Sequence, residues 1–525
     1  MASERFNLAT ALVDRHVEAG DGACVALRAA GRDVTYAELA RLVVRSANAW
    51  RELGLQAQER LAIILPDSLD FVLAFLGAIR IGAVPVTLST LLRPADYAYL
   101  LADSRARAVA VHSSLAPAIE GIRADLRHLR TVVVVDGPEH RARIEEASDR
   151  LEAEPTRPDD VSFWQYSSGT TGRPKGVMHR QRSCATPAEL HGRHVVAMTR
   201  DDRSFSVAKL FFSYGINNSL VIPLHHGATS VLLADRPEPA RVFALVERER
   251  PTVFYGVPTG YAAALAHAET LPRLPDVSSV RVFVSAGEAL PKALFDRWKR
   301  RFGAEILDGI GSTEIGYICI SNVAGRARGG TSGQVIPGYE AMVAGDDGRS
   351  VPAGELGELW VKGPSTAAGY WNKRAETRRT FQGPWVRTGD RYVVDAEGYY
   401  TYVGRGDDML KVSGQWVSPL EVESALLEHD AVLECAVVGA TDADGLVKPR
   451  GFVVLKDGRR ASDALADDLK EFAKARIAPY KYPRWIDFVP ELPKTSTGKI
   501  QRYLLRDPSG RIEGDPSGRN KGDRS

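Results

Sequence analysis

The sequence predicts a multidomain α/β protein, with a large N-terminal domain of stacked α/β sheets, a small β-barrel-like section and a smaller α+β domain. Three observations support this fold class. At 525 residues, the chain is too long for one ordinary hydrophobic core. Up to about residue 330, short apolar runs rich in β-branched residues alternate with longer amphipathic stretches. After that point the chain becomes rich in glycine, and its apolar runs become short and alternating.

The first part of the chain predicts a mostly parallel sheet with helices on both faces. Residues 61–65 (LAIIL) predict a buried strand, and residues 67–82 predict a helix that begins at Asp67 or Ser68. Residues 239–250 predict another helix. Strands and helices that alternate along a chain are typical of a parallel sheet covered on both sides. The strand signal returns in VPVTL (84–88), AVAVH (108–112), TVVVV (131–135), TSVLL (229–233) and VRVFVS (280–285).

The architecture is predicted to change in the second part. Residues 330–363 carry short alternating strands, as in an antiparallel or barrel-like section. The stretch after Arg405 mixes helical and strand signals over roughly a hundred residues, which predicts a small α+β domain. Its helical signals are SPLEVESALLEHD (418–430) and DALADDLKEFAKARI (463–477), and its strand signals are CAVVGA (435–440) and GFVVL (451–455).

These changes of texture give the domain borders. Residues 1–405 are predicted to form the N-terminal domain, and residues 406–506 the C-terminal domain. Residues 507–525 contain DPSGR twice and almost no apolar side chains. Such a segment cannot bury enough surface to offset the entropy of ordering, so we expect a disordered tail.

Composition excludes several classes of protein. Hydrophobic residues make up 44% of the chain and charged residues 26%, which is the balance of a globular protein. A net charge of +2 gives no reason to expect a nucleic-acid partner, although a nucleotide needs only a local positive cluster. The apolar stretch 71–88 is interrupted by Arg80, Gly82 and Pro85, so no membrane span or membrane partner is expected.

The cysteines and the N-terminus favour a cytoplasmic location. Cys24, Cys184, Cys319 and Cys435 lie far apart and form no Cys-x-x-Cys pair, which argues against a zinc site and a disulfide framework. Charged residues interrupt the first 20 positions, so they lack the apolar core of a signal peptide.

A glycine- and hydroxyl-rich loop follows the strand-like segment VSFWQY. Residues 166–178 read YSSGTTGRPKGVM. Glycines allow backbone N–H groups to approach an anion, hydroxyls add donors and Lys175 adds a positive charge. Gly176 follows Lys175 where a P-loop NTPase has a metal-binding hydroxyl, so that motif does not fit. The loop therefore predicts a different kind of polyphosphate site, with a flexible surface loop as the plain alternative. Its candidate residues are Ser167, Ser168, Gly169, Thr170, Thr171, Gly172 and Lys175.

With four later motifs in order, the chain resembles the adenylate-forming superfamily, which contains acyl-CoA synthetases, adenylation domains and firefly luciferase. Nearly the whole chain up to about residue 506 is covered, and five motifs in register are a strong signal. The phosphate loop, SSGTTGRPKG, is the first of them. The others are GSTE (311–314), RTGD (387–390), GRGDDMLK (404–411) and PKTSTGK (493–499).

The resemblance implies ATP, Mg²⁺ and coenzyme A as the small molecules of the reaction. A carboxylate would attack the α-phosphate of ATP, so two anions must be brought together. Lys499 would place a cation between them, Glu314 would hold Mg²⁺, and Thr170 in the loop would contact the phosphates. Taken alone, each of these side chains would more often be an ordinary surface residue. Nucleotide contacts are implied for Gly309, Ile310, Gly311, Ser312, Thr313, Asp390 and Arg405. Among them, the carboxylate of Asp390, in the RTGD motif, would hold the ribose hydroxyls.

The same resemblance implies a mobile C-terminal domain that turns about Asp407 between the two half-reactions. Lys411 and Gly414 would then line the channel of the CoA pantetheine. Many relatives have an aromatic residue before the glycine of the second motif, where it stacks on adenine. Ile310 occupies that position here, so weaker stacking is expected.

Several segments resemble the benzoate–CoA ligase branch more narrowly, among them KLFFSYG (209–215) and LKVSG (410–414). This resemblance implies an aromatic carboxylate as substrate, held in a flat slot between small residues. The implied residues of the aryl acid pocket are Ser213, Tyr214, Ala286, Gly287, Gly311, Tyr317 and Ile318. Tyr214 could equally be a core aromatic residue.

Benzoate enzymes often carry His where Tyr317 stands and Ala where Ser213 stands. Two additional hydroxyls predict a ring with a polar substituent, because a buried hydroxyl needs a partner. Our hypothesis is a hydroxybenzoate, with salicylate a leading candidate and aminobenzoate and benzoate as alternatives. Delivery of the acyl group to a carrier-protein phosphopantetheine, or a non-catalytic binding role on the same fold, are the competing functions. The sequence leaves the oligomeric state undetermined.

Overall fold

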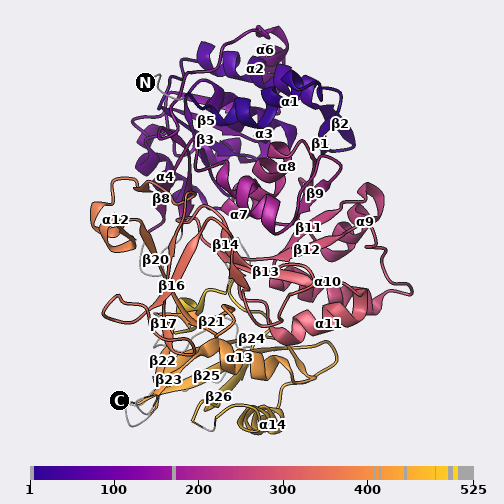
Figure 1. The fold of residues 1–525 in the computed structure, drawn as a ribbon, viewed down its shortest axis with the longest axis vertical. Coiled ribbons are helices and arrows are strands. Elements are labelled where there is room, and N and C mark those ends of the chain that lie inside the picture. Colours follow the sequence, from indigo (N-terminus) through magenta and orange to yellow (C-terminus); the bar gives the residue numbers. More distant parts are fainter. Residues whose placement is uncertain are drawn as a thin grey trace, which may run out of the picture. The chain divides into compact units, whose positions relative to one another are not determined.

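The computed structural model describes residues 5–167, 173–406, 408–412, 415–442, 446–478, 480–494 and 500–506, but not the side chains of Lys411, Gln415, Trp416 and Tyr503. The chain divides into two compact units, Met1–Asp407 and Asp408–Ser525 (Figure 1). The buried apolar side chains of the two units form separate clusters.

The larger unit contains a nine-stranded sheet among its described residues. Its six central strands are parallel to one another, and antiparallel strands flank them at both ends. The spatial order is β15 (Gln334–Val335), β14 (Ile318–Ser321), β13 (Ile306–Gly311), β12 (Val282–Ser285), β11 (Val253–Gly256), β9 (Arg203–Ser206), β10 (Thr229–Leu232), β1 (Val25–Ala29) and β2 (Arg32–Thr35).

Helices cover both faces of this sheet because its strands are apolar on both sides. Phe254 and Phe283 pack on one face, in a cluster with side chains of the helices α9 (Pro239–Glu249), α10 (Pro258–Thr270) and α11 (Lys292–Phe302). Figure 1 shows these three helices beside β11 and β12. The neighbouring residues Tyr255 and Val284 point to the opposite face and belong to the main core. This alternation follows from the two-residue period of a strand.

A second, seven-stranded sheet in the described part of the larger unit carries the predicted phosphate loop. Five parallel strands are followed by two antiparallel ones. The helix after β3 begins where the sequence indicates, because the Ser68 hydroxyl caps it by accepting from Phe71 N at 3.2 Å. The order is β18 (Gly369–Tyr370), β8 (Lys175–Arg180), β7 (Val161–Ser167), β4 (Val84–Thr87), β3 (Arg60–Ile64), β5 (Ala108–Val111) and β6 (Thr131–Val134).

The glycine-rich section after residue 330 forms an antiparallel sheet of five described strands. Its recorded pairings leave the sheet open: β21 (Tyr400–Arg405) pairs with β20 (Trp385–Val394), and the remaining strands follow in a row. These strands are β16 (Glu340–Ala344), β17 (Leu356–Lys362) and β19 (Phe381–Gln382).

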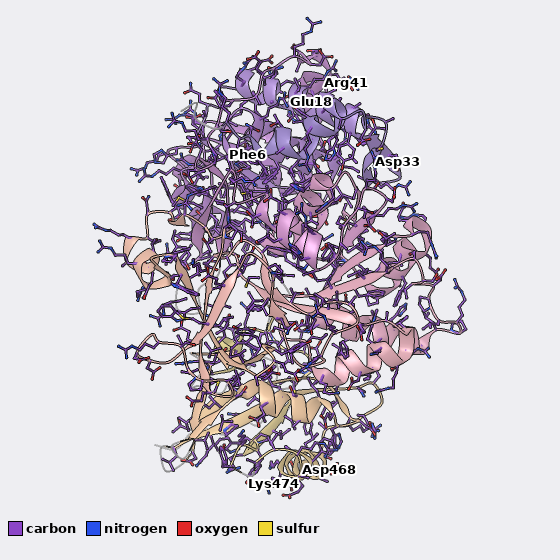
Figure 2. All side chains as sticks on the ribbon, viewed as in Figure 1. Phe6, Glu18, Asp33, Arg41, Asp468 and Lys474 are labelled. Carbon is purple, nitrogen blue, oxygen red and sulfur yellow. The ribbon has the colours of Figure 1, made fainter. Side chains whose placement is uncertain are left out.

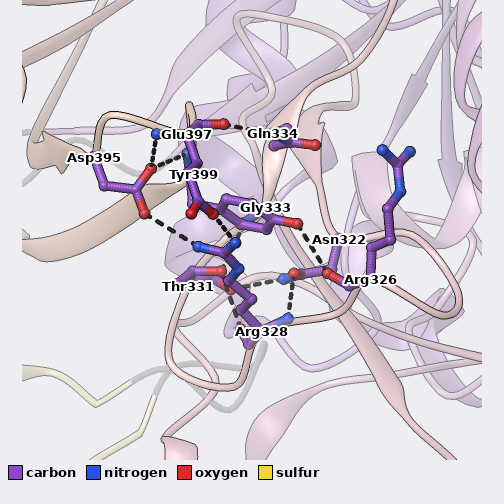
Figure 3. Close-up of polar contacts among 9 residues, drawn as sticks. All are labelled: Asn322, Arg326, Arg328, Thr331, Gly333, Gln334, Asp395, Glu397 and Tyr399. Carbon is purple, nitrogen blue, oxygen red and sulfur yellow. Dashed lines mark hydrogen bonds and ion pairs between the residues drawn. The ribbon is translucent and has the colours of Figure 1, made fainter.

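A polar cluster joins this open sheet to the loop after β14 (Figure 3). Arg328 pairs with Asp395 and Glu397 in the turn between β20 and β21, and its guanidinium lies 3.8 Å from the ring centroid of Tyr399. Asn322 accepts from Arg328 N at 2.9 Å. This cluster therefore fixes the loop after β14 against the turn between β20 and β21.

The helices of the larger unit are α1 (Arg15–Glu18), α2 (Tyr36–Glu52), α3 (Leu69–Arg80), α4 (Pro94–Ser104), α5 (Ala116–Glu120), α6 (Pro138–Glu146), α7 (Ser213–Ile216), α8 (Ile222–His225), α12 (Arg374–Thr380) and the three named above. Short 3₁₀ and π segments lie at Thr10–Asp14, Ser113–Leu115, Arg123–Asp125, Ala188–Gly192 and Asn217–Val221. Within the described ranges, no helix is both long and apolar enough to cross a membrane.

The smaller unit is an α+β arrangement. A hairpin of β22 (Leu410–Val412) and β23 (Gln415–Val417) accompanies a sheet of β24 (Val432–Thr441), β25 (Val447–Leu455) and β26 (Trp485–Phe488). Its helices are α13 (Pro419–Leu427), α14 (Asp463–Lys474) and α15 (Arg502–Leu505). Asp468 and Lys474, both labelled in Figure 2, belong to α14. Asp468 accepts from His429 at 3.1 Å. The predicted α/β class, with a large sheet-based N-terminal part and a small C-terminal part, is confirmed.

Candidate active site

The base of the predicted phosphate loop is a pair of antiparallel strands. β7 ends at Ser167 and β8 begins at Lys175, and the register pairs these two residues. β7 runs parallel to β4, so the loop leaves the carboxyl-terminal edge of the sheet. That edge is where ligands bind in open α/β sheets. The loop residues Ser168, Gly169, Thr170, Thr171 and Gly172 lie outside the described residues.

Glu314 of the second motif lies beside this base. Its Oε1 atom accepts from the Ser167 hydroxyl at 2.8 Å and from the Tyr370 hydroxyl at 2.9 Å. Its backbone carbonyl accepts from Ala367 N at 2.9 Å. The Lys175 ammonium lies 4.4 Å from the ring centroid of Tyr370. The structure therefore brings the first two predicted motifs together, with Tyr370 between them.

Electrostatics around Glu314 follow from burial and from its own charge. Burial, together with the neighbouring carboxylate, raises the pKa of Tyr370 above its usual value, so the phenol keeps its proton as a donor. Burial lowers the pKa of His179 to about 4 although Glu314 opposes this shift. His179 is therefore neutral at pH 7 and supplies no positive charge beside Glu314.

The residues present fit the Mg²⁺ that the resemblance implies. Mg²⁺ is typically held by one or two carboxylates together with substrate phosphates and water. Glu314 supplies one such carboxylate: both hydroxyls bind Oε1, and Oε2 has no recorded hydrogen-bond partner among the described residues. Oε2 is thus the atom that would hold the ion.

The second motif continues the end of β13 into a tight turn. Ser312 Oγ accepts from Ile315 N at 3.3 Å, and the carbonyls of Ser312 and Thr313 accept from Gly316 N. A Cβ on Gly311 would stand 2.2 Å from the carbonyl oxygen of Tyr317, so only glycine fits there. Gly309 and Ile310 precede the turn in β13, and Ile310 is partly buried against the main core.

The predicted ribose carboxylate is held by the last strand of the larger unit. Asp390 of β20 is opposite Arg405 of β21, and Arg405 Nη1 donates to Asp390 Oδ1 at 3.0 Å and to Thr388 O at 2.9 Å. Arg387 of the same motif pairs with Glu358 at 2.6 Å and so has a structural partner. Arg405 and Asp390, which are both predicted to contact the nucleotide, thus form an ion pair with each other.

The structure gathers most of the predicted aryl-pocket residues. The Ser213 hydroxyl donates to Gly316 O at 2.9 Å, and the Tyr214 and Tyr317 rings lie 6.1 Å apart. Tyr214 is half-buried and Tyr317 almost fully buried. Ile318 follows at the start of β14, and Ala286 and Gly287 follow the end of β12, which is adjacent to β13. Gly287 has a φ of +96°, a conformation that favours glycine.

The physical reason given for a polar ring substituent was wrong in one respect: both additional hydroxyls already have partners. Ser213 donates to Gly316 O, and the Tyr317 hydroxyl donates to Asn218 Oδ1. The Asn218 amide in turn donates to Ser206 Oγ at 3.2 Å. The protons of both hydroxyls are therefore committed, and only their lone pairs remain available to a ligand.

Several residues of this region were missed in the sequence. Asn217 and Asn218 are buried; Asn217 Nδ2 donates to the carbonyls of Ser213 and Gly316, at 2.8 and 3.2 Å. Two adjacent asparagines within the apolar run GINNSLVIPL were a usable signal, because buried amides need partners. Tyr370 and His191 carried no such signal. The His191 ring lies edge-on to the Tyr317 ring, with 5.0 Å between the ring centroids.

The segment that carries Ser213 and Tyr214 is anchored by another missed residue, Asp67. Its Oδ1 accepts from Leu210 N at 2.9 Å, and its Oδ2 lies 4.0 Å from Lys209 Nζ. Lys209 also donates to the carbonyls of Leu233 and Asp235. Burial raises the pKa of Asp67 to about 6.

The predicted lysine and hinge residues cannot be placed. Lys499, Asp407 and Gly414 lie outside the described residues, as does the Lys411 side chain. Nearby, Lys494 and Ile500 form an antiparallel bridge, and Lys494 pairs with Glu434 at 2.7 Å. Buried Glu423 pairs with Arg502 at 2.8 Å and accepts from Val437 N at 2.7 Å, which ties α15 to α13 and β24.

The chain belongs to the AMP-binding enzyme family: the profile of that family matches residues 13–371, and the profile of the AMP-binding enzyme C-terminal domain matches residues 421–499. The adenylate-forming resemblance drawn from the five motifs is thereby confirmed.

Within this family, the chain falls in the benzoate–CoA ligase branch. It is 49% identical to a benzoate–CoA ligase of Thauera aromatica, over 96% of both chains. It is 47% identical to a 4-hydroxybenzoate–CoA/benzoate–CoA ligase of Rhodopseudomonas palustris, over 97% of this chain and 95% of that one. Among solved structures, the anthranilate CoA ligase AuaEII in complex with anthranoyl-AMP is 42% identical with a TM-score of 0.91, over 95% and 96% of the two chains.

Proposed function

We propose that this protein is an ATP-dependent aryl carboxylate–CoA ligase. A carboxylate oxygen of the acid attacks the α-phosphorus of ATP, the bond to the β-phosphate oxygen breaks, and pyrophosphate leaves. The CoA sulfur then attacks the acyl carbon of the acyl-adenylate, and AMP leaves. The observation that carries this proposal is the meeting of Ser167, Glu314 and Tyr370 at the base of the phosphate loop.

Each half of the reaction is assigned to residues of this chain. Mg²⁺ on Glu314 would offset the charge of the departing pyrophosphate. Ser167 and Tyr370 orient the carboxylate of Glu314. Asp390, positioned by Arg405, would accept from the ribose hydroxyls. We assign Lys499 to the first half-reaction. We assign Lys411 and Gly414 to the second, with Asp407 as the hinge between domains 1–405 and 406–506.

The substrate class follows from the pocket and from the relatives. Relatives that act on benzoate, 4-hydroxybenzoate and anthranilate share most of this chain's length, which supports a small aromatic acid. The Ser213 and Tyr317 oxygens can only accept, so a ring hydroxyl or amino group suits them better than a nitro or methoxy group. No described contact singles out salicylate among the hydroxybenzoates.

Exchange of labelled pyrophosphate into ATP, dependent on added acid, tests the first half-reaction. Exchange rates should be compared for benzoate, hydroxybenzoates, aminobenzoates, nitrobenzoates and methoxybenzoates. We expect faster exchange with acids whose ring substituent donates a hydrogen bond than with acids whose substituent can only accept one. No exchange with any arylcarboxylate, or faster turnover of long-chain fatty acids, would refute the proposal. Thioester formation with CoA as the sole thiol distinguishes this ligase from an enzyme that loads a carrier protein.

Four free cysteines support a cytoplasmic location.

A further inference from the structure

Three arginines occupy one row across neighbouring strands of the seven-stranded sheet. Arg60 begins β3, and Arg107 and Arg130 directly precede β5 and β6. The register of these parallel strands, continued by one residue, places the three arginines side by side at the amino-terminal ends. Backbone hydrogen bonds of 2.9 Å join the row, from Arg107 N to Arg60 O and from Arg130 N to Arg107 O. Side chains at one register position of a parallel sheet share a face, and adjacent strands are only about 4.8 Å apart.

These side chains line a cavity of about 160 Å³, which we name the arginine cleft. Its lining residues are Glu59, Arg60, Arg105, Arg107, His128 and Arg130. Glu59 is the one acidic residue among them, and its Oε1 lies 3.7 Å from Arg107 Nε. The cleft therefore carries four guanidinium groups against one carboxylate.

The charge of Arg60 is fixed in place. Its guanidinium donates to the carbonyls of Ser104, Gln58 and Arg105, at 2.9, 3.0 and 3.4 Å. It also lies 5.5 Å from the ring centroid of Trp371. Carbonyls and an aromatic ring orient a guanidinium without neutralising it, so the wall of the cleft keeps its positive charge.

His128 also lines the cleft and lies among these positive charges. Arg127 Nε donates to His128 Nε2 at 3.2 Å, which requires a ring nitrogen that accepts. Desolvation and the charges of four arginines, at positions 127, 105, 60 and 130, lower the pKa of His128.

We propose that the arginine cleft is an anion site that binds a polyphosphate group, either inorganic pyrophosphate or the phosphate tail of a nucleotide. Like charges side by side on a sheet are destabilising, so an unoccupied row has a cost that a bound anion removes. Planar guanidinium groups bind phosphate oxygens in pairs, and several of them match a multiply charged anion.

This site is separate from the proposed catalytic phosphate site. The loop between Ser167 and Lys175 leaves the carboxyl-terminal edge of β7, which runs in the same direction as β3, β5 and β6. The arginine row lies at the amino-terminal edge of the same sheet. Binding at the cleft is therefore independent of whether the chain forms adenylates.

The experiment follows the ring signal of His128 by NMR in the full-length protein, with the signal assigned by a His128→Gln variant. Pyrophosphate at constant ionic strength should shift it saturably, with Kd below about 1 mM. In Arg107→Gln/Arg130→Gln, binding should weaken by about tenfold or more. A control of equal charge, Arg241→Gln/Arg300→Gln on α9 and α11, should bind like the parent. Because the probe lies in the cleft, pyrophosphate at the active site does not contribute.

The sources of the anion are distinguished by titrating tripolyphosphate, ATP and CoA in parallel. Tighter binding of ATP or CoA than of pyrophosphate assigns the cleft to a nucleotide, and the reverse assigns it to the inorganic anion. Arg105→Gln, an exposed substitution outside the row, provides a second test if the double variant is unstable. Three results would overturn the proposal. The first is a shift of the His128 signal with KCl equal to that with pyrophosphate, and the second is a pyrophosphate shift retained in both Arg107→Gln/Arg130→Gln and Arg105→Gln. The third is tighter binding of an RNA oligonucleotide than of any of these anions.

Discussion

At the scale of single residues, two ordinary hydroxyls orient the carboxylate of Glu314, the residue that we propose as the Mg²⁺ ligand. Ser167 and Tyr370 both bind Oε1, from two strands that lie on either side of β8. Hydrogen bonds to a charged acceptor are stronger than neutral ones and fix its orientation. The carboxylate is therefore oriented before ATP arrives, and orientation set in advance lowers the barrier to reaction.

The Tyr370→Phe variant tests this orientation. Loss of one hydrogen bond to a carboxylate should lower acid-dependent pyrophosphate exchange by about 10- to 100-fold, since such bonds contribute ~1.5–3 kcal/mol. Glu314→Gln should abolish exchange almost completely. Tyr399→Phe, which removes a hydroxyl bonded to Arg326 O, is the matched control and should keep parental activity. Unchanged exchange in Tyr370→Phe would show that the tyrosine does not orient Glu314.

Tyr317→Phe separates the stabilising role of the pocket hydroxyl from its role in selection. Buried Asn218 Oδ1 would lose its donor, so the free energy of unfolding should fall by about 1–3 kcal/mol. The ratio of hydroxybenzoate to benzoate kcat/KM should also fall, because the acceptor for the ring hydroxyl is gone. Tyr36→Phe, whose hydroxyl bonds Ala228 O at 2.8 Å, should lower stability without changing that ratio. A constant ratio in Tyr317→Phe would exclude contact with the substituent.

At the scale of elements, the aryl pocket depends on how α7 is attached to the sheet. The segment before it is fixed by Asp67, which lies between β3 and α3 and is more than a hundred residues away in sequence. Apolar runs and caps made β3 and α3 predictable, because those signals are local. The contact of Asp67 with Leu210 was not predictable, because a lone Asp before a helix is ordinarily read as a cap.

Asp67 also predicts a pH effect on stability. Its pKa is about 6 in the folded protein and 3.8 ordinarily, so between these values the folded state holds a proton that the unfolded state releases. Ionised Asp67 thus opposes folding above pH 6, and this penalty, at most about 3 kcal/mol, disappears as the pH falls toward 4. Thermal unfolding should show the parent gaining stability relative to Asp67→Asn from pH 7 to 4.5. Asp296→Asn on α11 is the control, and parallel pH curves for parent and Asp67→Asn would contradict the assignment.

The site itself was predictable to the extent that its residues lie in contiguous motifs. Residues that belong to a motif of several consecutive positions could be selected from the sequence, and these are Ser167, Glu314, Asp390 and Arg405. Tyr370 and His191 complete the same site from single positions, where nothing in the neighbouring sequence marks them, whereas the pair Asn217–Asn218 in an apolar run was a signal that could have been used. The pairing of the Ser213 and Tyr317 hydroxyls could not be read from the sequence, because their partners, Gly316 O and Asn218, are set by tertiary contacts.

At the scale of the whole molecule, the chain is divided between one unit that holds the described nucleotide and acid residues and another that carries the predicted lysines. We expect Lys499→Ala to lose acid-dependent pyrophosphate exchange by 100-fold or more (~3 kcal/mol). The same variant should still form the thioester from a supplied acyl-adenylate.

Lys411→Ala should show the opposite pattern, with pyrophosphate exchange retained and thioester formation from the adenylate reduced. Each lysine thereby serves as the control for the other. Equal losses in both half-reactions for both variants would contradict a division of labour between two positions of the C-terminal domain.

The close approach at Gly311 has a practical consequence for anyone who wishes to redirect this enzyme. The carbonyl that excludes a side chain at this position is part of the backbone of Tyr317, so no rotamer can move aside. Substitution of Gly311 therefore cannot be used to enlarge or narrow the substrate range. Libraries aimed at bulkier or smaller acids should vary positions 213, 214 and 317, where a side chain already stands, although changes at 213 and 317 give up the hydrogen bonds to Gly316 O and Asn218 Oδ1.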